Sequence, residues 1–122
     1  MKIHVGIGEI VDKLSILMIK KNNILDTNKL ENINKELEYL NGIVKELEID
    51  SEDIFQLQDV NKKLWQIEDS IRDKERNKIF DDEFVYLARQ VYITNDLRAE
   101  IKRKMNEKYS SDFIEEKSYS EY

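Results

Sequence analysis

Apolar residues recur at alternating intervals of three and four along most of this chain, which is the spacing of one face of an α-helix. The 122 residues include no proline and only three glycines, so little interrupts long helices. The pattern is clearest over residues 28–47, where it forms a heptad-like seam typical of coiled-coil packing. Its members are Leu30, Ile33, Leu37, Leu40, Val44 and Leu47. The sequence therefore predicts an all-α fold.

Turn-forming residues divide the pattern into four helices, expected at about residues 9–23, 28–47, 52–77 and 82–108. The first is apolar almost all round, which is typical of a central helix. Short connections make consecutive helices antiparallel neighbours. We therefore expect a four-helix antiparallel bundle built from two helical hairpins, in which the fourth helix contributes a core stripe of Phe84, Leu87, Val91, Ile101 and Met105.

Capping and domain limits follow from the same pattern. Asp26 or Thr27 is suited to cap the second helix, and Ser51 the third. We assign residues 1–111 to one helical bundle domain with a short extended N-terminus. Residues 112–122 (DFIEEKSYSEY) form an acidic, aromatic C-terminal tail with three apolar side chains able to dock on the bundle: Phe113, Ile114 and Tyr119.

Composition excludes several classes of function. The net charge of −6 gives no basic footprint for nucleic acid. Cysteine is absent and His4 is the only histidine, which leaves almost no material for a zinc site or a His-based catalytic triad. No secretory signal is recognisable, and the longest apolar run, residues 16–19, is far too short to cross a bilayer. We expect a cytoplasmic protein with no membrane insertion.

Polar residues lie on otherwise apolar faces of the last two helices. Asn61, Glu68 and Arg72 fall within about 40° of one another on the third helix, and Asn95 and Arg98 share a face of the fourth. A turn near residue 79 places Asn61 opposite Arg98. Because burying such groups unpaired costs about 1–3 kcal/mol each, they must pair with one another or with a ligand. Either they form a network that fixes helix register, or they line a pocket that holds a small anion.

Two further features bear on this cluster. Trp65, the only tryptophan, is expected to be a core residue that forms the wall beside it. Glu9, Asp12, Glu68 and Asp69 are weak candidates for a magnesium site, because hard cations take oxygen ligands. Charged pairs on solvated helix faces are the more ordinary explanation, so we expect no cofactor and keep magnesium as the alternative.

Four segments resemble one family of small uncharacterised helical proteins of bacteria and their viruses. They are residues 7–17 (IGEIVDKLSIL), 60–72 (VNKKLWQIEDSIR), 84–106 (FVYLARQVYITNDLRAEIKRKMN) and 115–119 (EEKSY). The family is known only as a domain of unknown function. Its members are often found near, or fused to, glycosyltransferase-like proteins. The resemblance therefore implies a role in surface-polysaccharide assembly and a docked EEKSY segment.

Three functional hypotheses follow. The first is an accessory protein that acts through a partner protein or as a homo-oligomer in glycan biosynthesis. The second is a small-molecule enzyme or binding domain that holds an anion with Asn61, Glu68, Arg72, Asn95 and Arg98. Small helical chorismate mutases hold a dicarboxylate with arginines and a glutamate, but their helix order and motif do not match this chain. The third is a magnesium-dependent nucleotide pyrophosphohydrolase, for which the chain offers the Glu9-x-x-Asp12 pair but no E-x-x-E partner.

Overall fold

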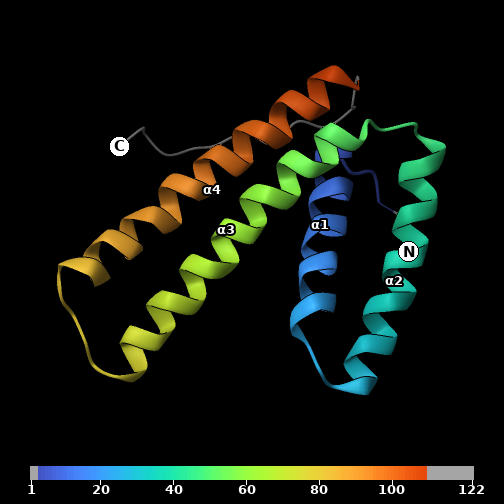
Figure 1. Ribbon diagram of the computed structural model, residues 1–122. Coiled ribbons are helices and arrows are strands. Elements are labelled where there is room, and N and C mark those ends of the chain that lie inside the picture. Colours follow the sequence, from blue (N-terminus) through green and yellow to red (C-terminus); the bar gives the residue numbers. More distant parts are fainter. Residues whose placement is uncertain (1–2, 110–122) are drawn as a thin grey trace.

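The computed structural model describes residues 3–109, which form four α-helices (Figure 1). They are α1 (Ile7–Asn23), α2 (Thr27–Glu46), α3 (Ser51–Arg76) and α4 (Asp82–Lys108). All four predicted helices are present, each boundary lies within two residues of its expected place, and the all-α prediction is confirmed. The predicted tail at 112–122, with Phe113, Ile114 and Tyr119, lies outside the described residues.

Local capping explains where α2 and α4 begin. The Asp26 carboxylate accepts a hydrogen bond from the Lys29 amide at 3.0 Å, and that of Asp81 accepts one from the Phe84 amide at 2.9 Å. Both caps satisfy amide groups that have no partner inside the helix. The expected Ser51 cap is wrong, because Ser51 is itself the first residue of α3.

Helix α1 lies at the centre of the fold, as its apolar composition predicts. It packs against α2, α3 and α4, whereas α2 packs against α1 alone among the described helices. Leu14 of α1 and Leu57 of α3 are almost fully buried. The core around them also contains Val11, Leu17, Ile33, Leu37, Leu40, Val44, Ile49, Val60 and Met105.

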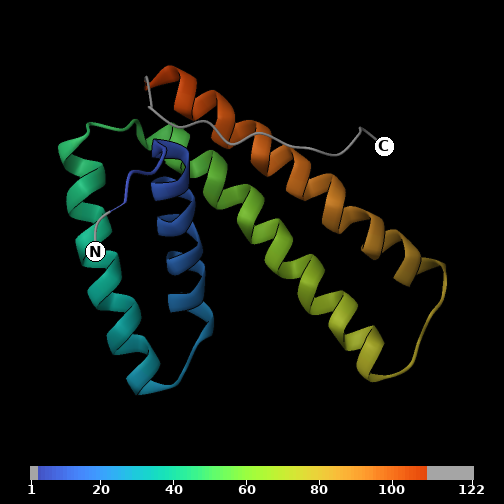
Figure 2. The ribbon, with the colours of Figure 1, turned by 180° about the vertical axis from the view of Figure 1, so that it is seen from behind.

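The two hairpins, α1–α2 and α3–α4, meet at one end and diverge at the other (Figure 1, Figure 2). As a result, no residue from 65 to 93 is buried. We call this part of the α3–α4 hairpin the arm. The predicted core stripe of α4 is therefore only partly correct. Met105 is buried, and Ile101 is half-buried but packs against the core. Phe84, Leu87 and Val91 lie in the arm and are half-buried because no third helix covers them.

No helix of the described part of the chain is long and apolar enough to cross a membrane.

Candidate functional site

The carboxylate of Asp12 joins three helices. It lies on the buried face of α1 with its side chain only 5% exposed. Arg98 of α4 binds it through two guanidinium nitrogens, with Nε donating to Oδ1 at 2.8 Å and Nη2 donating to Oδ2. Asn61 of α3 donates its amide Nδ2 to Oδ1 at 2.8 Å. A charge-assisted, bidentate pair of this kind is among the stronger polar contacts in proteins.

Ser15 completes the hydrogen bonding around this carboxylate. Its hydroxyl donates to the backbone carbonyl of Asp12 at 2.7 Å and accepts a second hydrogen bond from the Asn61 amide at 2.7 Å. Asn61 therefore uses both amide hydrogens. Among the described residues no buried side-chain nitrogen or oxygen lacks a partner.

A second cation, Lys102, binds the same edge of α1. Its ammonium group pairs with the Glu9 carboxylate and lies 3.9 Å from Oδ2 of Asp12. One turn further along α4, Oδ1 of Asn106 accepts the Gly8 amide hydrogen at 2.7 Å. This contact satisfies an otherwise unpaired amide at the start of α1. It gives a physical reason why α1 begins two residues earlier than the sequence pattern predicts.

The network is balanced in charge. Two carboxylates, Asp12 and Glu9, face two cations, Arg98 and Lys102. The predicted proximity of Asn61 and Arg98 is therefore real, but they meet on Asp12 and not on each other. A carboxylate held by a guanidinium and an amide is suited to fixing the relative positions of helices.

An open cleft of about 520 Å³ lies beside this network. It is lined by residues of α1, α3 and α4. All five residues of the predicted polar cluster contribute to it, which brings Glu68, Arg72 and Asn95 together with Asn61 and Arg98. The complete lining is Ile16, Ile19, Asn61, Leu64, Trp65, Glu68, Asp69, Arg72, Asn95 and Arg98.

The cleft has an apolar floor and a charged rim. Trp65 lines the cleft, but it is half-buried and lies outside the hydrophobic core, so the prediction of a core residue is wrong. On the rim, the Arg72 guanidinium Nε lies 3.3 Å from Oε2 of Glu68, and the Arg72 side chain is 72% exposed. Asp69 has no hydrogen-bond or ion-pair partner among the described residues. Nη1 of Arg98 donates to Oδ1 of Asn95 at 3.5 Å, so Arg98 is held by protein groups on both sides.

The four candidate magnesium ligands do not come together. Glu9 and Asp12 pair with cations in the network, whereas Glu68 and Asp69 line the cleft. Within residues 3–109, no group of three or more histidine, aspartate or glutamate side chains is placed to hold a metal ion.

The model of a protein family of unknown function, DUF6165, matches residues 1–122. The chain belongs to the DUF6165 family. This match confirms the resemblance to an uncharacterised family. No curated protein and no solved structure gives a significant match.

Sequence reasoning missed a second polar cluster in this DUF6165 chain, where α4 ends beside the start of α3. The Lys108 ammonium lies 3.0 Å from Oδ2 of Asp50 and 2.8 Å from Oδ2 of Asp53. The Tyr109 hydroxyl donates to Asp53 at 2.6 Å and accepts from the Asp50 amide at 2.9 Å. Burial opposes ionisation of Asp53, but hydrogen bonds from Lys108 and Tyr109 outweigh it and lower the Asp53 pKa.

Sequence reasoning also missed the central role of Asp12, which it considered only as a metal ligand. The signal was available in the first helix. That helix is apolar almost all round, so some of its polar side chains are expected to face other helices. Asp12 and Ser15, three residues apart, are both buried. The identity of their partners could not be read from the pattern of one helix.

Proposed function

We propose that this protein is a non-catalytic accessory protein that binds a segment of a partner protein in the cleft between α1 and the arm. One observation carries the proposal. The cleft combines an apolar floor, which includes Ile16, Ile19 and Trp65, with a charged rim. An apolar centre inside a polar rim is the usual anatomy of a protein–protein contact, and tryptophan and arginine are the residue types most often dominant in binding energy.

The adjoining network supports a binding role over catalysis. Its buried charges are already paired with one another, so Asp12 and Arg98 serve as a rigid base for the cleft. Residues held in this way position a binding surface.

The rim defines the chemistry of the partner. Asp69 offers a carboxylate without a partner in the described structure, while Arg72 and Glu68 already form an exposed pair. The segment that fits best presents an apolar side chain to the floor and a basic side chain to Asp69. The chain resembles a family whose members are often found near glycosyltransferase-like proteins. This resemblance supports a partner from surface-polysaccharide assembly.

Affinity capture from the native host tests this proposal. We expect wild-type protein to retain a specific partner and Trp65→Ala to lose it. Phe55→Ala is the matched control, because Phe55 is an exposed aromatic residue of α3 outside the cleft. The purified partner should then change the fluorescence of Trp65, the only tryptophan. A partner retained equally by Trp65→Ala, or substrate turnover by the isolated chain, would contradict the proposal. A partner with no role in glycan assembly would contradict only the proposal that the partner belongs to surface-polysaccharide assembly.

A small ligand in the same cleft is the second candidate function. The observation that favours it is the convergence of all five predicted polar residues on one lining. Titration with phosphates, nucleotides and nucleotide sugars, followed by Trp65 fluorescence and thermal unfolding, tests this candidate. Arg72→Ala should weaken a real anion site, whereas Arg76→Ala should not, because Arg76 pairs with Asp73 outside the cleft. The absence of any response to the panel would count against the candidate.

A further inference from the structure

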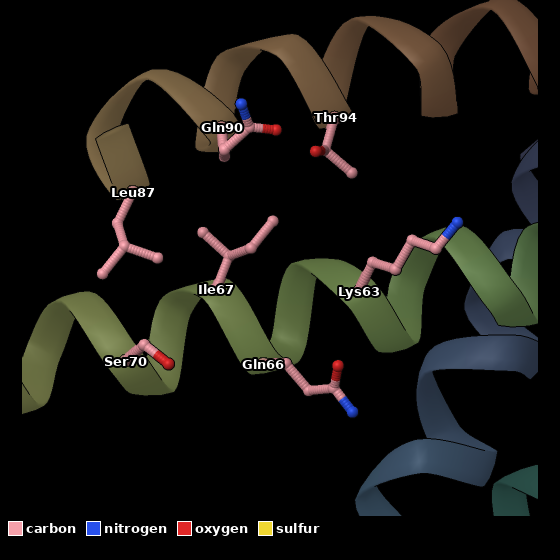
Figure 3. Close-up of a pocket in the computed structure, with 7 residues that line it drawn as sticks. All are labelled: Lys63, Gln66, Ile67, Ser70, Leu87, Gln90 and Thr94. Carbon is pink, nitrogen blue, oxygen red and sulfur yellow. The ribbon is translucent and has the colours of Figure 1, made fainter. Parts of the chain in front are cut away.

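One flank of α4 carries a row of four side chains that lies outside both the cleft and the contact with α3. They are spaced by four, three and four residues, so they lie within about 60° of one another around the helix. We call them the α4 stripe: Tyr92, Asp96, Ala99 and Arg103. The α4 stripe begins about 120° around the helix from Leu87, which extends towards α3 (Figure 3). It therefore faces away from the other helix of the hairpin.

The α4 stripe is more covered than its position predicts. Asp96 and Arg103 are half-buried, and Tyr92, Asp96 and Arg103 each take part in a polar, charged or aromatic interaction within the chain. Helix α1 does not account for the burial. It binds α4 through Arg98 and Lys102, which lie about 100° or more around the helix from Asp96 and Arg103. A further segment of the same chain accounts for both observations.

The opposite side of α4 differs in chemistry. A shallow groove of about 250 Å³ lies there between α3 and α4 (Figure 3). Ile67 of α3 and Leu87 of α4 extend towards each other across it. Its other lining residues are Lys63, Gln66, Ser70, Gln90 and Thr94. This lining includes one cation and no carboxylate, so the groove offers no ion pair to a basic side chain.

Residues 110–122, which follow α4 and lie outside the described residues, carry a pattern complementary to the α4 stripe. In an extended segment, alternate side chains point to the same side. One side then presents a carboxylate, an ammonium group and an aromatic ring: Glu115, Lys117 and Tyr119. From its end backwards, α4 presents a guanidinium, a carboxylate and an aromatic ring: Arg103, Asp96 and Tyr92. An antiparallel arrangement therefore sets each charge against its opposite.

We infer that residues 112–119 bind the α4 stripe as an extended segment that runs antiparallel to α4. The reach of the chain fits this arrangement. Going back from Tyr109 to Asp96 covers about 20 Å along the helix axis, at about 1.5 Å per residue. The extended chain from Tyr109 to Lys117 covers about 26 Å, at about 3.3 Å per residue. About two residues therefore remain for the reversal of chain direction, at Ser110 and Ser111.

The level of Lys117 sets the other contacts. With Lys117 level with Asp96, Tyr119 lies level with Tyr92, and Glu115 lies between Ala99 and Arg103. Lys117 then also faces Glu100, which is four residues from Asp96 on the same side of α4. Like charges at this spacing destabilise a helix, so a cation between them is favourable.

Arg103 is able to bind a second carboxylate. Its Nε lies 3.5 Å from Oε1 of Glu107 in a partly exposed pair within α4. A guanidinium has five N–H donors, so Arg103 can serve Glu107 and Glu115 together.

Introduced thiols test the docking in the full chain, which has no cysteine of its own. The double variant Ala99→Cys, Glu115→Cys should form an intramolecular disulfide about tenfold faster than Leu97→Cys, Glu115→Cys. Leu97 is the matched control, because it is exposed and lies at nearly the same level on another side of α4. Non-reducing electrophoresis at low protein concentration separates the intramolecular product from cross-linked dimers. Equal rates, or faster reaction at Leu97, would overturn the inference.

A charge reversal tests the register. In the Ala99→Cys, Glu115→Cys protein, Lys117→Glu should slow disulfide formation about two- to fivefold, and the further change Asp96→Lys should restore the rate. Lys29→Glu is the matched control, because Lys29 is an exposed lysine of α2, and it should leave the rate unchanged. Circular dichroism confirms that each variant is folded. No rescue by Asp96→Lys, or an equal effect of Lys29→Glu, would overturn the proposed register.

Discussion

Arg98 of α4 binds Asp12 of α1 through two nitrogens, across 86 positions of the sequence. Asn61 of α3 donates to the same carboxylate. Three helices are thus joined at one buried side chain, close to the point where the two hairpins diverge. The pair therefore ties α4 to α1 beside the cleft that Asn61 and Arg98 help to line.

Loss of the Asp12 charge should destabilise the fold. Asp12→Asn leaves Arg98 and Lys102 without their buried counter-ion, and removal of one partner of a buried ion pair costs about 3–5 kcal/mol. We expect a loss of about 3 kcal/mol in the free energy of unfolding, near the lower limit because the Arg98 side chain is partly exposed. Arg98→Ala should have a similar effect. Urea denaturation followed by circular dichroism measures both.

Arg72→Ala is the control for that prediction. Arg72 also pairs with a carboxylate, that of Glu68, but it does so four residues away on an exposed helix face. Pairs of this kind contribute about 0.3–0.5 kcal/mol. If Arg98→Ala changed stability as little as Arg72→Ala, the network would not have the structural role assigned to it.

Substitution of two glycines by alanine should change the stability of the fold in opposite directions. A Cβ at Gly8 would lie 2.7 Å from the backbone carbonyl oxygen of Lys102 and 3.1 Å from Oδ1 of Asn106. Because a backbone atom cannot easily move aside, Gly8→Ala should lower stability by about 1–3 kcal/mol. A Cβ at Gly42, inside α2, meets nothing within 4 Å. Gly42→Ala should raise stability by about 0.5–1 kcal/mol, because alanine favours the helix. Thermal unfolding of both variants shows directly whether each substitution raises or lowers stability.

Acid should weaken the contact between α4 and the start of α3. The folded-state pKa of Asp53 lies below its ordinary value of 3.8, because Lys108 and Tyr109 donate hydrogen bonds that outweigh its burial. A lowered pKa of a carboxyl group gives stability that is complete above the unfolded value and is lost as pH falls through the folded value. The unfolding free energy of the wild type should thus decline below about pH 4 more steeply than that of Asp53→Asn. Parallel curves for the two proteins would show that Asp53 does not contribute.

Removal of a core leucine from α1 should destabilise the fold. Leu14 is 1% exposed in the core, so Leu14→Ala should lower the free energy of unfolding by about 2–5 kcal/mol through lost burial and an unfilled cavity. Leu25→Ala supplies the matched control, because Leu25 lies outside the helices and is exposed. It should change stability by less than about 0.5 kcal/mol. Chemical denaturation of the two variants under one condition compares them.

Much of the fold was predictable from short-range pattern. The seam from Leu30 to Val44 identified α2, and Asp26 marked where that helix starts. These features depend on residues within one or two turns of one another, which is the range over which helix formation and capping act. The faces of α3 and α4 that carry Asn61 and Arg98 were also predicted correctly, because helical periodicity fixes which residues share a side.

The sequence by itself therefore determined the four helices, their polar faces and the central position of α1. Only the tertiary structure decided that Arg98 and Asn61 meet on Asp12, that Glu68 and Arg72 face an open cleft, and that the arm leaves the core. The reason is physical. A helical wheel specifies which side of a helix is apolar, but burial depends on whether another helix reaches that side. In the arm α3 and α4 cover only each other, so the stripe that includes Leu87 and Val91 is half-buried and Tyr86 is exposed.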